Sequence, residues 1–248
     1  RKMDTAAMAQ RARDNNEMYM LQRSISVGDT QDADCAVAAA HILEGGDGPV
    51  LTIEAGATLA FTANSDFFIV NRGSQIFAVG TETSPITFTS VSDIESAREA
   101  TPTLEFDAVQ QWGGMVINGF GVTNKCDYTG SVAGGDLATT DCHVDAEGAA
   151  GLDESQYGGD NNSDSSGRME YVRVKHTGAQ VANGDELNGI SFGGVGSNTI
   201  VNNLEVYSTF DDGIEMFGGA VNFNNFVALY VRDDAIDIDE GYSGTITN

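Results

Sequence analysis

The last sixty residues of the chain repeat one motif three times, and this repeat limits the fold more than any other feature. An isoleucine preceded by glycine or alanine recurs as Ile190, Ile214 and Ile236, at spacings of 24 and 22 residues. Two asparagine pairs, at 202–203 and 224–225, are also 22 residues apart. The segments between them are short and rich in Ile, Val, Phe and Tyr, which is typical of strands. Such a period indicates a solenoid whose turns stack on each other.

The period and the strand lengths predict an all-β fold, a single-stranded parallel β-helix of about 22 residues per turn. A leucine-rich repeat is excluded, because its Leu-x-x-Leu-x-Leu frame is absent. Strand alternation places Ile214 and Met216 inside, with Glu215 and Phe217 outside. By the same alternation, Ile236 and Ile238 would point inward from the next turn. Equivalent positions of neighbouring turns would lie about 4.8 Å apart.

Composition divides the chain into three parts. Residues 1–23 are rich in Ala, Met, Gln, Arg and Glu and contain no Gly or Pro, which predicts an α-helical arm or cap. Residues 24–48 form a connection, and residues 49–248 form the β-helix, with a short helix expected near 94–100. A loop excursion at about 119–167 is rich in Gly, Asp, Ser and Thr, and loops of this length are functional or disordered.

The charge excludes some partners and favours others. The chain carries 37 acidic and 12 basic residues, a formal net charge of −25. Nucleic acid is excluded as a partner, because phosphate binding needs a basic surface. An acidic surface instead suits divalent cations or a basic partner. No run of eighteen apolar residues occurs, so the sequence predicts no transmembrane helix.

The two ends of the chain suggest self-assembly. Residues 1–23 carry five of the twelve basic residues, so this segment either caps its own solenoid or docks on an acidic neighbour. The last repeat has no cap, and an exposed strand edge tends to pair with something. A head-to-tail contact that does not close produces a filament. The residues expected in this assembly are Arg1, Lys2, Arg11, Arg13, Met18, Met20 and Arg23.

The cysteines favour an oxidising compartment. Cys126 and Cys142 share one loop and lack the paired C-x-x-C spacing of a zinc site. We expect a disulfide between them, and therefore an extracellular or outer-surface location. The alternative is two free thiols. Cys35 is left over, and it is either buried and inert or paired with another chain.

Two groups of side-chain oxygens are candidates for binding Ca²⁺, which prefers oxygen ligands. In a stacked register, acidic residues of successive turns meet, namely Asp211, Asp212, Glu215, Asp233, Asp234, Asp237 and Asp239. A second group in the loop excursion consists of Asp160, Asn162 and Asp164. The alternative for the first group is that the aspartates only accept hydrogen bonds from turn amides. The alternative for the second group is a solvated turn.

Several motifs in order resemble one family. They include Pro-Ile-Thr-Phe-Thr-Ser at 85–90, Trp-Gly-Gly-Met-Val-Ile at 112–117, Ser-Ser-Gly-Arg-Met-Glu-Tyr-Val-Arg-Val at 165–174 and Asp-Asp-Gly-Ile-Glu-Met-Phe-Gly-Gly at 211–219. Together they resemble a family of secreted or surface-anchored bacterial proteins with a right-handed, pectate-lyase-like parallel β-helix, mostly of unassigned activity. The resemblance covers about residues 49–248. It implies the fold and a cell-surface location, and it implies no activity.

These observations predict a non-enzymatic extracellular structural or adhesive surface protein, stabilised by Ca²⁺ and able to assemble end to end with copies of itself. The first alternative is a polysaccharide lyase or hydrolase. A glycosidase needs two carboxylates facing each other across a cleft, and a lyase needs a basic residue beside a calcium site, where Arg232 is the candidate. The Asp211–Asp212 pair superficially resembles the aspartates of polygalacturonase-like β-helix enzymes, but the Arg-x-Lys motif that should follow the pair precedes it here, as Arg173 and Lys175. The second alternative is a module that binds surface polysaccharide without cleaving it.

Overall fold

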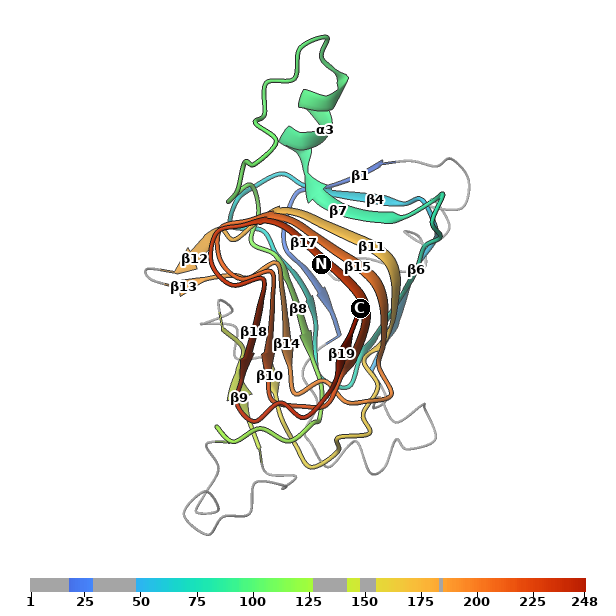
Figure 1. Cartoon of the computed structure of the whole chain (residues 1–248), viewed down its shortest axis with the longest axis vertical. Coiled ribbons are helices and arrows are strands. Elements are labelled where there is room, and N and C mark those ends of the chain that lie inside the picture. The colour runs from blue at the N-terminus through green and yellow to red at the C-terminus, as the bar shows by residue number, and fades with distance from the viewer. Residues whose placement is uncertain (1–17, 29–47, 127–141, 148–154, 183–184) are drawn as a thin grey trace.

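The structure is a computed structural model, and it describes residues 18–28, 48–126, 142–147, 155–182 and 185–248. The described chain passes back and forth between two parallel sheets, which form facing walls (Figure 1). Sheet A has the order β1 (Met18–Leu21), β4 (Thr58–Phe61), β7 (Ile86–Ser90), β11 (Gly167–Thr177), β15 (Ile200–Thr209), β17 (Asn222–Val231) and β19 (Ile246–Thr247). In the same sheet, β6 (Gln75–Val79) also pairs with β11, and β3 (Val50–Ile53) pairs with β6. Sheet B has the order β2 (Ile25–Val27), β5 (Phe68–Val70), β8 (Met115–Asn118), β14 (Ile190–Gly193), β16 (Ile214–Phe217) and β18 (Ile236–Asp239).

The register confirms the predicted parallel β-helix. Ile190 pairs with Ile214, and Ile214 pairs with Ile236, all in parallel strands. The turns are not of one length, because Phe68 of β5 pairs with Met115 of β8, 47 residues later. The additional residues include α3 (Val91–Arg98), which stands outside the solenoid in Figure 1. This helix was expected near 94–100, and it begins earlier because Ser90 Oγ caps it by accepting from the Asp93 amide.

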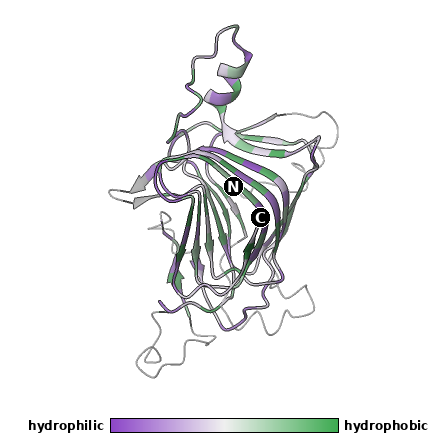
Figure 2. Ribbon diagram, viewed as in Figure 1, coloured by the Kyte–Doolittle hydropathy of each residue, from purple (hydrophilic) through white to green (hydrophobic). Residues whose placement is uncertain are grey.

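The predicted alternation of side chains is confirmed on β16. Ile214 and Met216 are fully buried in the core between the sheets, whereas Phe217 packs in a second cluster outside sheet B. On the last described rung, Ile236 and Ile238 are 36% and 55% exposed. Figure 2 shows hydrophobic residues concentrated along the strands, with polar residues on α3 and at several turns. The apolar side of each strand therefore builds one continuous core.

The corners of the solenoid require left-handed backbone, and asparagine tolerates this conformation better than most residues. Asn203 and Asn225 have φ angles of 52° and 58° and lie in adjacent rungs. Asn225 Nδ2 donates to Asn203 Oδ1 at 3.0 Å. The repeated asparagines therefore turn the chain and also link one rung to the next.

The predicted helical arm is wrong for the part of it that the structure describes. Met18–Leu21 is strand β1, which pairs with β4, and Ile25–Val27 is strand β2, which pairs with β5. These two strands add a rung to the solenoid inside the segments predicted as an arm and a connection. Pairing with residues about forty positions later outweighs helix propensity, which is a weak preference. Met18 and Met20 therefore belong to a strand, and Arg23 follows it.

The remaining arm residues, Arg1, Lys2, Arg11 and Arg13, lie outside the described residues, as does Cys35. Two short antiparallel strand pairs lie outside the two parallel sheets. They are β9 (Val144–Asp145) with β10 (Gln156–Tyr157), and β12 (Gln180–Ala182) with β13 (Asp185–Glu186). Among the described residues, no helix is long and apolar enough to cross a membrane.

Candidate metal centre

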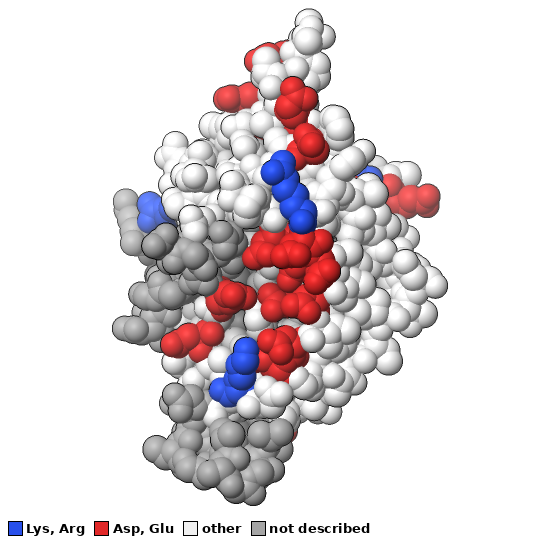
Figure 3. All heavy atoms as spheres, turned by 60° about the vertical axis from the view of Figure 1, so that its left-hand side comes forward, with Lys and Arg blue, Asp and Glu red and all other residues white. Residues whose placement is uncertain are grey.

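Acidic side chains gather on the outer face of sheet B at its last two strands. Parallel pairing of β16 with β18 places Glu215 directly beside Asp237. The turns that precede these strands carry Asp211 with Asp212 and Asp233 with Asp234. Figure 3 shows acidic side chains as a band on this side of the molecule, with basic groups near both ends of the band. The repeat therefore places carboxylates of adjacent rungs together, as the sequence predicted.

Within the described residues, the carboxylates form two overlapping groups of three. Asp211, Asp212 and Asp233 form the first group, and Asp212, Glu215 and Asp237 form the second. In each group, one oxygen from every residue lies within 4.8 Å of the others. Asp212 belongs to both groups, so we call the five residues together the acidic ladder. The predicted ligands Asp234 and Asp239 lie outside both groups.

Hydrogen bonds fix the orientation of the acidic ladder. Asp212 Oδ1 accepts from the backbone N–H of Asp234 at 2.9 Å. Asn188 Oδ1 accepts from the backbone N–H of Asp212 at 3.2 Å, and Asn188 Nδ2 donates to Glu215 Oε2 at 2.7 Å. The alternative role for the aspartates, accepting from turn amides, thus holds for one oxygen each of Asp212, Asp237 and Asp239.

Sequence reasoning missed Asn188. Its signal was present, because Asn188, Asp212 and Asp234 each stand directly before the Gly or Ala that precedes the repeated isoleucine. The three residues therefore occupy one row along the solenoid, and Asn188 and Asp212 each accept from the backbone amide of the next residue in that row. Asn188 is the uncharged member of this row, and its side-chain amide donates to Glu215.

Burial and neighbouring charge disfavour the ionised forms of the two central carboxyl groups. Burial raises the pKa of Glu215 to about 8, against a lowering by the Asn188 hydrogen bond, and Glu147, Asp212 and Asp237 raise it further. Burial likewise raises the pKa of Asp212 to about 6, against the hydrogen bond from the Asp234 amide. Each carboxylate loses hydration and meets like charge, and both effects favour the neutral acid. A bound cation would reverse this preference.

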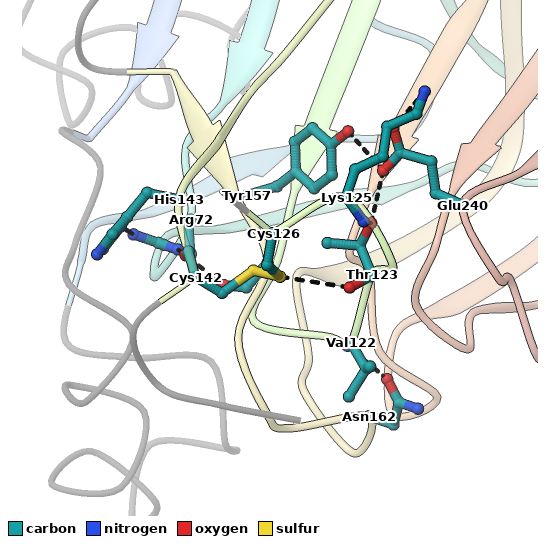
Figure 4. Close-up of a disulfide and its surroundings, with 11 residues drawn as sticks. Arg72, Val122, Thr123, Lys125, Cys126, Cys142, His143, Tyr157, Asn162 and Glu240 are labelled. Carbon is teal, nitrogen blue, oxygen red and sulfur yellow. Dashed lines mark hydrogen bonds and ion pairs between the residues drawn. A yellow bond between two sulfur atoms is a disulfide. The ribbon is translucent and has the colours of Figure 1, made fainter. Parts of the chain in front are cut away.

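Beside the acidic ladder, a buried carboxylate joins the last rung to the loop excursion (Figure 4). Glu240 Oε2 accepts from Thr123 Oγ1 at 2.6 Å and from Tyr157 Oη at 2.8 Å. Lys125 Nζ lies 3.1 Å from Glu240 Oε1 and 3.3 Å from Asp239 Oδ2. The backbone N–H of Glu240, together with Lys125, lowers the pKa of Asp239. Asp239 therefore pairs with Lys125 instead of joining the acidic ladder.

The hairpin formed by β9 and β10 covers part of the outer face of sheet B. Tyr157 of this hairpin lies against Gly193, where an added Cβ would be 2.6 Å from the tyrosine ring. Burial, with Glu240 as the next cause, raises the pKa of Tyr157 well above its ordinary value. The hairpin also brings Glu147 close enough to influence Glu215. It therefore adds one more negative charge to the surroundings of the acidic ladder.

The predicted disulfide between Cys126 and Cys142 is present and buried (Figure 4). Its neighbour Arg72 is fully buried and donates from Nη1 to the carbonyl oxygens of Cys142 and Gly158, both at 2.7 Å. The disulfide joins the segment that holds Glu240 to the segment that leads into the hairpin. The loop excursion is thus anchored at both of these places.

Two residues of the second predicted calcium group accept hydrogen bonds from backbone amides of the protein. Asn162 Oδ1 accepts from the Val122 amide at 2.8 Å, and Asp164 Oδ2 accepts from the Phe120 amide at 3.2 Å. Asp164 is buried, whereas Asp160 is exposed. These bonds fix the segment after β8, so calcium binding by Asp160, Asn162 and Asp164 stays a prediction.

The donor set of the acidic ladder suits a hard cation. It contains carboxylate oxygens without sulfur or imidazole, which is the preference of Ca²⁺. Carboxyl pairs of glycosidases are separated by roughly 5–5.5 Å or 6.5–9.5 Å, which leaves room for substrate or water. Oxygens within 4.8 Å of each other are better placed to chelate one ion.

The family model described as the pectate-lyase-like beta helix domain matches residues 30–248. No curated protein and no solved structure gives a significant match. The matched region includes nearly all of the rungs described above, the acidic ladder and the disulfide. The chain therefore belongs to the family of pectate-lyase-like β-helix domains.

Proposed function

We propose that this protein is a non-enzymatic extracellular module with a structural or adhesive role at an outer surface, and that Ca²⁺ stabilises its β-helix. The observation that carries the proposal is the acidic ladder, in which Asp212 belongs to two groups of three carboxylates drawn from adjacent rungs. A cation held there links the rung of β16 to the rung of β18.

Electrostatics supports a cation at this place. Like charges one strand spacing apart destabilise a sheet. Here the cost is larger than at an open surface, because Asp212 and Glu215 are 8% exposed each. A divalent cation offsets both the repulsion and the lost hydration. Asp233 of the ladder is exposed and Asp211 and Asp237 are half-buried, so the ion can enter from solvent.

The proposed location outside the cell rests on the disulfide and on charge. Disulfides persist in oxidising compartments and are rare in reducing ones. The net charge of −25 keeps such a module soluble in a medium that contains abundant divalent cations.

End-to-end self-association is part of the proposal. It is supported by charge, because residues 1–23 carry five basic against three acidic residues, whereas the remainder carries seven against 34. Opposite charge on these two parts favours contact between residues 1–23 of one copy and the acidic surface of another.

Light scattering after size exclusion, in calcium and in chelator, tests the proposal. We expect particles larger than the 26.1 kDa monomer in calcium and a fall towards that mass in chelator. In parallel, calcium at a hundred times its Kd should stabilise the fold by about 2.7 kcal/mol in thermal unfolding. Unchanged thermal midpoints would refute the stabilising cation. A monomer in both buffers would refute self-association and leave the cation proposal standing.

A polysaccharide-cleaving enzyme is the second candidate, favoured by one observation. The pKa values of about 6 for Asp212 and about 8 for Glu215 lie on either side of neutral pH. Such a pair can supply a base and an acid. Release of reducing or unsaturated ends from acidic glycans, lost in Asp212→Asn, would establish this enzyme. Glycan binding without product would instead identify a binding module.

A further inference from the structure

The connection between α3 and Trp112, residues 99–111, crosses the flank of three successive rungs, and we call it the strap. It is held by residues of left-handed backbone that lie in one row, His176 of β11, Ser208 of β15 and Tyr230 of β17. Ser208 Oγ donates to the Phe106 carbonyl at 3.1 Å, and the Phe106 ring packs on Tyr230 at 5.0 Å. The strap therefore depends on contacts with three separate rungs.

His176 is the member of this row that contacts both the strap and α3. Its side chain is 2% exposed. Nδ1 lies 2.7 Å from the Ala108 carbonyl oxygen of the strap, and Nε2 lies 3.3 Å from Asp93 Oδ1 of α3. Gln111 of the strap also donates its backbone N–H to the His176 carbonyl at 2.9 Å. One imidazole thus bridges two segments that pack on the solenoid from outside.

Both partners of the imidazole are acceptors, so both ring nitrogens must donate. A carbonyl oxygen and a carboxylate can only accept, whereas a neutral imidazole carries one N–H. In either neutral tautomer, one nitrogen lone pair would face an oxygen. Only the imidazolium ion satisfies both contacts.

Titratable groups near the ring come from α3, β11, β15 and the strap. Asp93 lies on α3, Lys175 on β11, Tyr207 on β15 and Asp107 on the strap. Burial alone would raise the pKa of Asp93, but hydrogen bonds from His176, Lys175 and Thr89 outweigh it and hold that pKa well below its ordinary value. Asp93 therefore stays ionised throughout the pH range in which histidine ordinarily changes its charge. Histidine is the side chain whose charge ordinarily changes between about pH 5 and 8.

We propose that His176 is a pH-sensitive latch, whose imidazolium form holds the strap and α3 against the solenoid and whose deprotonation releases the strap at Ala108. The direction of the pH dependence follows from the number of N–H donors on the ring. At low pH the ring has two N–H groups and the latch is closed. As pH rises, the ring loses one N–H and the latch opens. This inference is independent of the acidic ladder and of any cation.

The single tryptophan is placed to report this change. Trp112 directly follows the strap, is fully buried and donates from Nε1 to the Lys175 carbonyl at 2.7 Å. We expect its fluorescence to change with pH in a transition that corresponds to the uptake of one proton. The transition should be absent in His176→Asn, whose amide can donate to one partner but cannot become charged. It should persist in His143→Asn, the control, and move to lower pH in Asp93→Asn.

A second measurement on the unaltered protein covers the case in which His176→Asn does not fold. The Gln110 and Gln111 amides donate to the carbonyls of Thr177 and His176. Their hydrogen-exchange protection, corrected for the intrinsic pH dependence of exchange, should fall about tenfold from pH 5 to pH 8, as expected for the loss of one charged hydrogen bond. Constant protection, or a fluorescence transition that survives in His176→Asn, would overturn the latch.

Discussion

Replacing Glu215 by glutamine is expected to raise the free energy of unfolding of the calcium-free protein by on the order of 3 kcal/mol at pH 8. In the folded protein, burial is the first cause that raises the pKa of Glu215 from 4.5 to about 8. The folded state therefore binds this proton more tightly than the unfolded state. The free energy of unfolding of the parent is therefore highest below about pH 4.5, and it declines as pH rises towards 8. The glutamine variant lacks this decline, so at pH 4 its free energy of unfolding should equal that of the parent.

Urea unfolding in chelator at pH 4 and pH 8 measures this effect, and exposed Glu82→Gln is the matched control. The control removes the same charge outside the acidic ladder and should change stability by less than about 0.5 kcal/mol. With calcium, the sign reverses, because the parent gains stability from the ion and the Glu215→Gln variant gains much less. A glutamine variant that is less stable than the parent at pH 8 in chelator would contradict the electrostatic account.

Replacing Trp112 by alanine is expected to lower the free energy of unfolding by about 3–5 kcal/mol. The Trp112 ring is fully buried and stacks on Phe61 with centroids 4.2 Å apart and planes within 4°. It also holds the end of the strap through its bond to the Lys175 carbonyl. The substitution therefore leaves a cavity and an unpaired carbonyl between rungs.

Circular dichroism during urea unfolding measures the loss, since the variant has no tryptophan to follow. Trp112→Phe is the matched control, because phenylalanine keeps a ring against Phe61 and loses only the N–H donor and part of the volume. It should lose clearly less stability than Trp112→Ala. Equal losses in both variants would show that the hydrogen bond, and not the stacking, carries the effect.

The last rungs could be predicted from the sequence because their signals are local. Alternation around Ile214 and the asparagine pairs at the corners fix both the strands and their register. Strand β1 could not be predicted in this way. Its partner β4 lies about forty residues away, and Met18–Leu21 by itself has the composition of a helix. The long-range pairing decides its structure, and no local pattern reports that pairing.

In the candidate site, too, the residues placed by the repeat could be predicted, and those placed by long-range contacts could not. Asp211, Asp212, Glu215, Asp233 and Asp237 could be placed together because the period alone stacks them. Asp239 is drawn away from the acidic ladder by its contact with Lys125, which lies 114 residues earlier in the loop excursion. Asp164 accepts a hydrogen bond from the Phe120 amide, which lies 44 residues earlier. Contacts made by a long loop have no period, so they could not be predicted.

Calorimetric titration of the purified protein with calcium at neutral pH tests the central claim most directly. The account predicts saturable binding, which Asp212→Asn abolishes because Asp212 belongs to both carboxylate groups, and which Glu82→Gln leaves unchanged. Absence of saturable binding in the parent, or equal binding in Asp212→Asn, would show that the acidic ladder does not hold the ion.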